Sequence, residues 1–109
     1  MTIDRPKASS LTLLMPTWTP GSYLIREFSK NIISISAKQK KTIQLEKIDK
    51  CSWTLNCNKN ESLSISYTVY AFEKTVRTSF VDQHEAMLNG ASIFIVPRTQ
   101  MEEKIEVSI

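Results

Sequence analysis

The feature that most constrains the fold of this chain is an apolar residue at every second position. In the longest such segment, residues 63–71, apolar side chains at the odd positions alternate with serine, threonine and Tyr70. Successive side chains of a β-strand point to opposite faces, so this period of two predicts a strand with one buried face. The same alternation, or a short apolar run, recurs over residues 33–37, 43–45, 51–57, 93–96 and 105–109. The chain is therefore expected to consist mainly of strands.

Turn signals link these segments. Residues 58–61, Asn-Lys-Asn-Glu, predict a hairpin between strands at 51–57 and 62–72. Asn89-Gly90 is a common hairpin turn. Helix is scarce, because only residues 22–30, with Ser22 as cap, and residues 82–88 suit short helical turns. The predicted fold class is all-β: an antiparallel β-sandwich with irregular loops and at most one or two short helical turns.

Size and composition limit the possible functions. The 109 residues are the size of one domain, and 41% hydrophobic with 23% charged side chains indicates a folded globular chain. The net charge is +3, but only Lys38, Lys40 and Lys41 cluster, which favours a solvated loop over a nucleic-acid face. No segment approaches the ~20 apolar residues of a membrane helix. Neither nucleic acid nor a membrane is expected as a partner.

Two cysteines, Cys51 and Cys57, fall in one predicted strand. An extended segment of that length spans roughly 20 Å at ~3.3 Å per residue. A disulfide needs Cα atoms within about 7 Å, so the two are not expected to pair with each other. Neither lies in a Cys/His pattern, which predicts structural thiols rather than nucleophiles. Free thiols favour a reducing, cytoplasmic compartment, although the sequence leaves localisation open.

Residues 18–28, WTPGSYLIREF, form an unusually dense mixture of aromatic, aliphatic and ionic groups. Pro20 fixes φ at about −65° and Gly21 accepts a positive φ, so the pair predicts a tight turn. Further blocks follow along the chain: KIDK with Trp53, YTVYAF at 67–72, VRT at 76–78 and LNGAS at 88–92. In order and spacing, these blocks resemble the glycyl aminopeptidase family, PDZ-containing zinc metallopeptidases that are distantly similar to aminopeptidase N. The pairs Lys74-Thr75 and Met87-Leu88 depart from the family pattern.

The resemblance implies the non-catalytic N-terminal β-domain of an enzyme that removes small residues, Gly or Ala, from peptide N-termini. Such enzymes hold zinc with an HExxH helix, in which two histidines lie one turn apart. His84-Glu85 begins that string here, but position 88 is Leu and the chain has one histidine. We therefore expect no metal, cofactor or catalytic residue in this chain. Zinc would belong to the parent enzyme, bound downstream of Ile109.

The remaining candidates for function are polar residues and glycine in the family-like loops. They are Tyr23, Arg26, Glu27, Arg77, Asn89 and Gly90. On one hypothesis these residues meet the catalytic domain or line its substrate cleft. On the other they are structural: Arg26 pairs with Glu27 or an aspartate, Arg77 clamps a nearby carboxylate, and Asn89-Gly90 joins two strands. Both tryptophans, Trp18 and Trp53, are expected to pack in the core or between sheet and loop.

We interpret residues 1–109 as a single N-terminal β-domain, excised from a larger metallopeptidase and truncated at strands on both ends. Its partners would be the downstream catalytic domain of the same chain and, in the parent, the peptide substrate. A truncated sheet exposes unpaired backbone groups, so two copies of the fragment are expected to pair through edge strands. The alternative is a free-standing β-sandwich module that binds protein or carbohydrate. Tyr67 and Tyr70 fall on opposite strand faces and form no aromatic row for that role.

Overall fold

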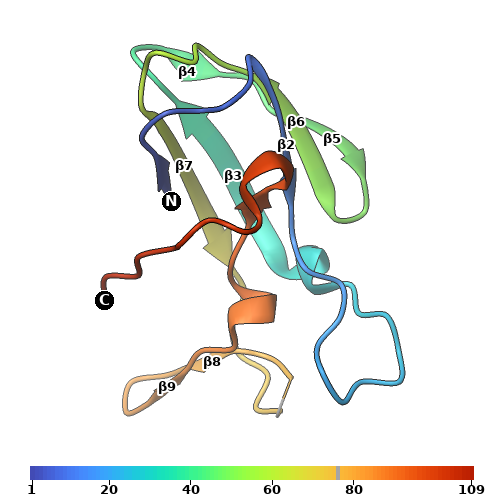
Figure 1. The fold of residues 1–109 in the computed structure, drawn as a ribbon. Coiled ribbons are helices and arrows are strands. Elements are labelled where there is room, and N and C mark those ends of the chain that lie inside the picture. Colours follow the sequence, from blue (N-terminus) through green and yellow to red (C-terminus); the bar gives the residue numbers. More distant parts are fainter. Residues whose placement is uncertain (76) are drawn as a thin grey trace.

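The computed structural model describes residues 1–75 and 77–109 and confirms the all-β, antiparallel sandwich (Figure 1). One sheet contains, in spatial order, β1 (Thr2–Ile3), β7 (Leu63–Val69), β3 (Ile32–Lys38) and β4 (Thr42–Ile43). The other contains β10 (Val96–Pro97), β2 (Ser10–Leu14), β6 (Ser52–Asn56) and β5 (Glu46–Asp49). A separate hairpin is formed by β8 (Phe80–Val81) and β9 (Ala86–Met87). Three single 3₁₀ turns are also described: η1 (Phe28–Asn31), η2 (Gly90–Ser92) and η3 (Arg98–Gln100).

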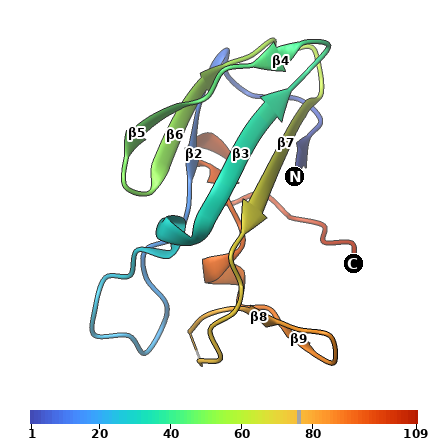
Figure 2. The same cartoon turned by 180° about the vertical axis from the view of Figure 1, so that it is seen from behind.

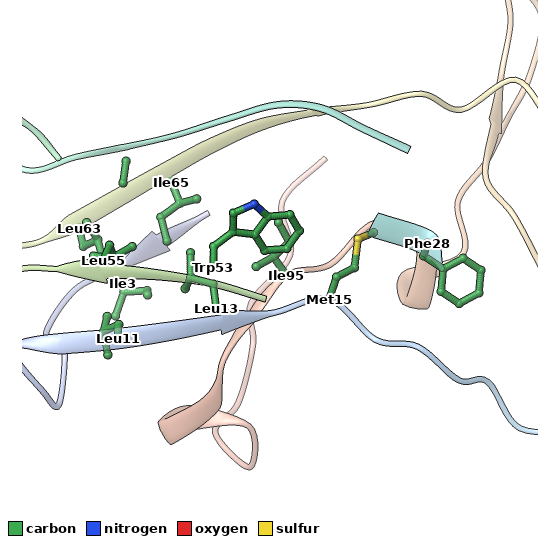
Figure 3. Packing of buried hydrophobic residues seen from close by; sticks show 11 residues of the cluster. Ile3, Leu11, Leu13, Met15, Phe28, Trp53, Leu55, Leu63, Ile65 and Ile95 are labelled. Carbon is green, nitrogen blue, oxygen red and sulfur yellow. The ribbon is translucent and has the colours of Figure 1, made fainter. Parts of the chain in front are cut away.

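The core lies between the two sheets, and both contribute side chains from alternate positions (Figure 3). Leu13 and Ile65 have no exposed surface, and Trp53 is only 4% exposed, as its place in the alternation predicts. Each such side chain contributes roughly 1.5–3 kcal/mol of burial free energy. At one end the cluster reaches Met15 and Phe28, where the chain leaves β2 and enters η1. The remaining core residues are Ile3, Leu11, Ala37, Leu55, Leu63 and Ile95.

The alternation in β3 is interrupted by one extra residue. Ile32 is opposite Val69 and Ser34 is opposite Thr68, so Ile33 has no partner on β7 and forms a bulge. Ile33 is consequently 68% exposed, whereas Ile32 packs against the core. The strand predicted at 33–37 is therefore confirmed, but the inward position expected of its first isoleucine is wrong.

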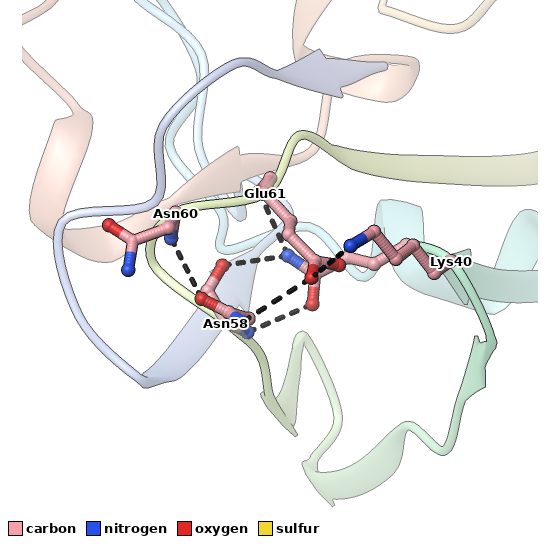
Figure 4. A network of polar contacts seen from close by, with 5 residues as sticks. Lys40, Asn58, Asn60 and Glu61 are labelled. Carbon is pink, nitrogen blue, oxygen red and sulfur yellow. Dashed lines mark hydrogen bonds and ion pairs between the residues drawn. The ribbon is translucent and has the colours of Figure 1, made fainter.

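The turn at residues 58–61 connects the two sheets instead of closing a hairpin. β6 pairs with β2 and β5, whereas β7 pairs with β1 and β3, so the predicted hairpin between 51–57 and 62–72 is wrong. The crossing is held by Gln39, which donates to the carbonyls of Asn58 and Glu61 at 2.8 and 2.9 Å, and by a Lys40–Glu61 ion pair (Figure 4). Both strands alternate correctly because each turns its apolar face to the same core.

Other connections also differ from the sequence predictions. Residues 82–88 form the turn and second strand of the β8–β9 hairpin, not a helical turn. In the run 93–96 only Val96 lies in a strand, because Ile93 and Phe94 close the turn of η2. Residues 105–109 form no strand, since this exposed segment has no neighbouring ladder. No helix among the described residues is long and apolar enough to cross a membrane.

Both cysteines are free and half-buried, and they flank β6 (Ser52–Asn56) instead of lying in the strand predicted at 51–57. Burial raises the pKa of the Cys57 thiol, and its Sγ donates to the Ala8 carbonyl at 3.3 Å. A thiol with a raised pKa carries less thiolate at neutral pH, which fits a structural residue.

One edge of the sandwich carries charged residues. All four residues of β5 are exposed, and Lys47 covers the Trp53 ring with its Nζ 5.4 Å from the ring centroid. Charged side chains on an edge strand discourage pairing with another chain. The opposite sheet ends at β1, where the Met1 amino group donates to the Ile65 carbonyl at 2.7 Å. The edge-strand dimer stays a prediction.

Candidate functional site

Two loops extend from the same end of the sandwich, and together they contain all six predicted candidates (Figures 1 and 2). The first loop, residues 17–27, connects β2 to η1. The second loop, residues 70–91, runs from the end of β7 through the β8–β9 hairpin into η2. η1 contacts η2, which brings the base of the first loop against the end of the second. We call this part of the molecule the loop end.

The first loop is closed by hydrogen bonds within its own backbone. The Ser22 N–H donates to Thr19 O at 3.1 Å across a turn in which Gly21 has φ +81°, so the predicted Pro-Gly turn is confirmed. At the base, the Arg26 N–H donates to Thr17 O at 2.6 Å. The Trp18 indole N–H donates to Ser22 O at 2.9 Å and braces the turn from one side.

Trp18 and Ser22 both differ from their predicted roles. Trp18 is 52% exposed and outside the core, because its indole N–H is used within the loop. Ser22 caps no helix, since η1 begins only at Phe28. The buried Ser22 hydroxyl instead donates to Leu24 O at 2.9 Å and accepts from Arg26 Nε at 3.3 Å. Polar bonds therefore shape this loop, and Tyr23 is left fully exposed.

Glu27 pairs with Lys50 instead of Arg26. Its Oε1 lies 2.8 Å from Lys50 Nζ, and this hydrogen bond lowers the pKa of the Glu27 carboxyl. The Arg26–Glu27 network predicted from the sequence is therefore wrong. The pair still links loop to sheet, as that hypothesis required, because Lys50 follows β5 directly. The Arg26 side chain stays within the first loop, where its Nε donates to the Ser22 hydroxyl.

The second loop is organised around an aromatic pair and a side-chain turn. The ring centroids of Phe72 and Phe80 are 5.4 Å apart. An isolated β-bridge between the same two residues joins the segment after β7 to β8. Asp82 Oδ1 accepts from the N–H groups of His84 and Glu85 at 2.7 and 2.8 Å, which closes the β8–β9 hairpin. These two bonds lower the pKa of the Asp82 carboxyl. Glu85 in turn pairs with Lys74.

Asn89-Gly90 begins a 3₁₀ turn instead of joining two strands. Asn89 is the cap of η2, and its Oδ1 accepts from the Ala91 N–H at 3.1 Å. Gly90 has no positive φ; a Cβ there would lie 3.2 Å from the Phe94 ring, so close packing explains the glycine. The predicted hairpin turn is therefore wrong, since the side chain of Asn89 caps a turn, as Asn commonly does.

Two buried serines fix Asn89 to the sandwich. Ser79 Oγ accepts from the Asn89 N–H at 2.9 Å and lies 2.8 Å from Ser92 Oγ. Ser92 Oγ donates to Asn89 O at 3.0 Å. Ser92 ends the LNGAS block, but nothing in the sequence distinguishes Ser79 from the exposed serines, so their pairing could not be predicted.

A hollow of about 620 Å³ opens between the two loops. It is lined by residues 18–21 of the first loop and by Arg77, Asn89 and Ala91 of the second. The hollow thus brings together two of the predicted candidates, Arg77 and Asn89. Tyr23, Arg26, Glu27 and Gly90 lie outside its lining. Val76, which belongs to the VRT block, is outside the described residues.

The residues that the structure describes do not fit a zinc site. His84 is exposed at the tip of the β8–β9 hairpin, where it lines a second hollow together with Phe72, Val81, Asp82 and Gln83. The Asp82 carboxylate already accepts hydrogen bonds from backbone N–H groups, and the Glu85 carboxylate forms an ion pair with Lys74. Among residues 1–75 and 77–109, no three His, Cys, Asp or Glu side chains are placed to hold a metal ion.

Comparisons with known proteins agree with this architecture. The family model of the peptidase M61 N-terminal domain matches residues 1–109. The crystal structure of an aminopeptidase N family protein from Idiomarina loihiensis superposes with a TM-score of 0.83 at 34% sequence identity. The match covers 91% of this chain and 17% of that one, so this chain spans about a sixth of the solved protein's length. No curated protein matches. With its sandwich, its loop blocks and a family model that matches throughout, the chain belongs to the peptidase M61 N-terminal domain family.

Proposed function

We propose that this chain is the non-catalytic N-terminal domain of a zinc-dependent aminopeptidase that removes small N-terminal residues, Gly or Ala, from peptides. Its loop end packs against the catalytic domain and helps to shape the substrate cleft. The zinc ion and the residues that activate water belong to that second domain, since residues 1–75 and 77–109 contain no group of three His, Cys, Asp or Glu side chains placed to hold a metal. The domain's own contribution is to position and restrict the substrate.

The convergence of the family-like blocks on one hollow carries this proposal. The WTPG segment of the first loop is far in sequence from Arg77 of the VRT block and Asn89 of the LNGAS block, which both belong to the second loop. The fold nevertheless places all three around the same opening. The chain builds its core without them, because none of these residues belongs to the buried cluster. A surface assembled from two loops but unused by the core suits recognition.

Exposed apolar side chains indicate that the recognised surface is a protein. On the first loop, Leu24 and Ile25 are 62% and 73% exposed, next to the fully exposed Tyr23. On the second loop, Phe72 and Leu88 are 60% and 53% exposed. Large apolar and aromatic groups gathered at one end of a domain mark protein–protein contacts. A catalytic domain of the same polypeptide would cover them permanently.

The proposal is tested in the longer protein, by release of p-nitroaniline from Gly- and Ala-p-nitroanilide. A double change on the first loop, Leu24→Ser with Ile25→Ser, should lower kcat/KM and make the junction after Ile109 more sensitive to protease. Ile33→Ser is the matched control, because Ile33 is equally exposed but lies on β3. A metal chelator should abolish activity of every variant.

Two results would contradict the proposal. Aminopeptidase activity from purified residues 1–109 would show that the chain is itself catalytic. A loop-end variant with unchanged activity and unchanged protease sensitivity would show that this surface does not meet the catalytic domain.

A further inference from the structure

We propose that the hollow between the two loops is a carboxylate-binding site in which Arg77 supplies the positive charge. This inference rests on the proposed function only in taking peptide-borne carboxylates as the ligand class. The groups around the hollow support it independently, because they offer hydrogen-bond donors beside an aromatic side chain.

Arg77 is the first of these donors. Among the described residues its only hydrogen bond is from its backbone N–H to Thr75 Oγ1, at 3.2 Å. None of the four ion pairs of the described chain uses its guanidinium group. The sequence suggests three carboxylates as partners of Arg77: Glu27, Asp82 and Glu73. Glu27 pairs with Lys50 and Asp82 accepts from its own turn. None of the ion pairs among the described residues joins Arg77 to Glu73. A guanidinium group can hold a carboxylate through two parallel N–H···O bonds.

Asn89 is the second donor. Its Oδ1 is occupied by the Ala91 N–H, and its backbone groups by Ser79 and Ser92. These bonds fix the Asn89 side chain, while its Nδ2 group has no partner among the described residues. The amide oxygen thus already accepts one bond, and the free Nδ2 group offers two N–H donors. Asn89 therefore adds a donor that favours an anion over a cation.

Two backbone acceptors of the lining are already engaged. Thr19 O already accepts from the Ser22 N–H, and Asn89 O accepts from Ser92. The Trp18 N–H is used by Ser22 O, so the ring remains as an apolar wall. No side chain described as lining the hollow is acidic. A planar carboxylate with an apolar neighbour fits these groups, and a peptide provides both.

Such a carboxylate has two sources: the C-terminal α-carboxylate of a short peptide, or an Asp or Glu side chain of the catalytic domain. NMR titration of the 109-residue chain distinguishes them. N-acetyl-Gly-Gly presents an α-carboxylate, and N-acetyl-Glu-amide presents only a side-chain carboxylate. Their neutral counterparts are N-acetyl-Gly-Gly-amide and N-acetyl-Gln-amide. The reporters are the Arg77 Nε–H, the Asn89 Nδ2 and the Trp18 indole resonances.

Either carboxylate should shift all three reporters, and its neutral amide should not; the tighter of the two acids identifies the source. Arg77→Gln should weaken binding roughly tenfold or more, as expected when a charge-assisted hydrogen bond is lost. Arg98→Gln, which removes an exposed arginine on η3, should leave the affinity unchanged.

Three results would overturn the site: equal shifts from the amides, unchanged affinity in Arg77→Gln, or inorganic phosphate binding as tightly as either acid. The titration needs no catalysis, so its failure would leave the proposed aminopeptidase role untouched. Conversely, a longer protein without peptidase activity would not affect the binding result.

Discussion

The sandwich body and the loop end place the same residue types in opposite environments. Leu13 and Trp53 in the body are 0% and 4% exposed, whereas Leu24 and Trp18 at the loop end are 62% and 52% exposed. In the body, strand pairing satisfies the backbone and side chains are free to pack. At the loop end, hydrogen bonds of Ser22, Ser79 and Asn89 set the shape, and apolar groups face outward. The body is stabilised by burial, and the loop end is shaped for contact.

The sharpest way to break this comparison is to truncate one leucine in each region. Leu13→Ala should cost about 2–5 kcal/mol of unfolding free energy, because it opens a cavity between the sheets. Leu24→Ala should change it by no more than about 0.5 kcal/mol, since an exposed side chain leaves no cavity. Urea unfolding followed by Trp53 fluorescence measures both. Equal losses would mean that the chain buries Leu24 in a core of its own.

The second test concerns the joint between the two regions. Ser79→Ala leaves the Asn89 N–H without its acceptor and should cost about 1–3 kcal/mol, the penalty for an unsatisfied buried donor. Hydrogen exchange at the Asn89 amide should accelerate. Ser66→Ala is the control, because Ser66 is exposed on β7. An unaltered Asn89 exchange rate would show that the joint does not hold the second loop.

The same contrast explains how much the sequence could predict. The period of two correctly identified β3, β6 and β7, because burial of one strand face is a local property of the pattern. It could not distinguish a hairpin from a crossing between sheets, since β6 and β7 turn apolar faces to one core in either arrangement. The crossing is held by Gln39, which is distant in sequence from the turn it binds.

At the loop end, residue types indicated the site, but their contacts were not predictable. Pro20-Gly21 correctly predicted a turn, because Gly21 tolerates the positive φ that the turn requires. Asn89-Gly90 is an equally typical hairpin signal, but here Gly90 is favoured because a Cβ would lie too close to the Phe94 ring. The glutamate that Arg26 was expected to bind pairs with Lys50 instead. The Glu27 error involves a partner from another segment, which no local pattern reveals, whereas the Asn89-Gly90 error comes from packing within residues 89–94.

A third test strains the first loop alone. Gly21→Ala places a Cβ at φ +81° but against no neighbour within 4 Å, so its cost is backbone strain of about 1–2 kcal/mol. If the loop opens independently of the body, amide exchange at Ser22 and Arg26 should rise roughly tenfold or more. The Leu13 amide in β2 should exchange as before. Faster exchange at Leu13 would show instead that the loop end and the body unfold as one unit.

The smallest expected effect is the acid response of the second loop. Hydrogen bonds from His84 and Glu85 lower the pKa of Asp82 below its ordinary value of 3.8. A carboxyl with a lowered folded pKa stabilises the turn above pH 3.8, and that stabilisation is lost as pH falls through the folded pKa. The side-chain carboxyl carbon of Asp82 should therefore titrate with a midpoint below 3.8, and Asp82→Asn should remove this titration because the amide carries no carboxyl. A midpoint at or above 3.8 would show that these two bonds do not hold the carboxylate, and that the hairpin tip is less ordered than the body that carries it.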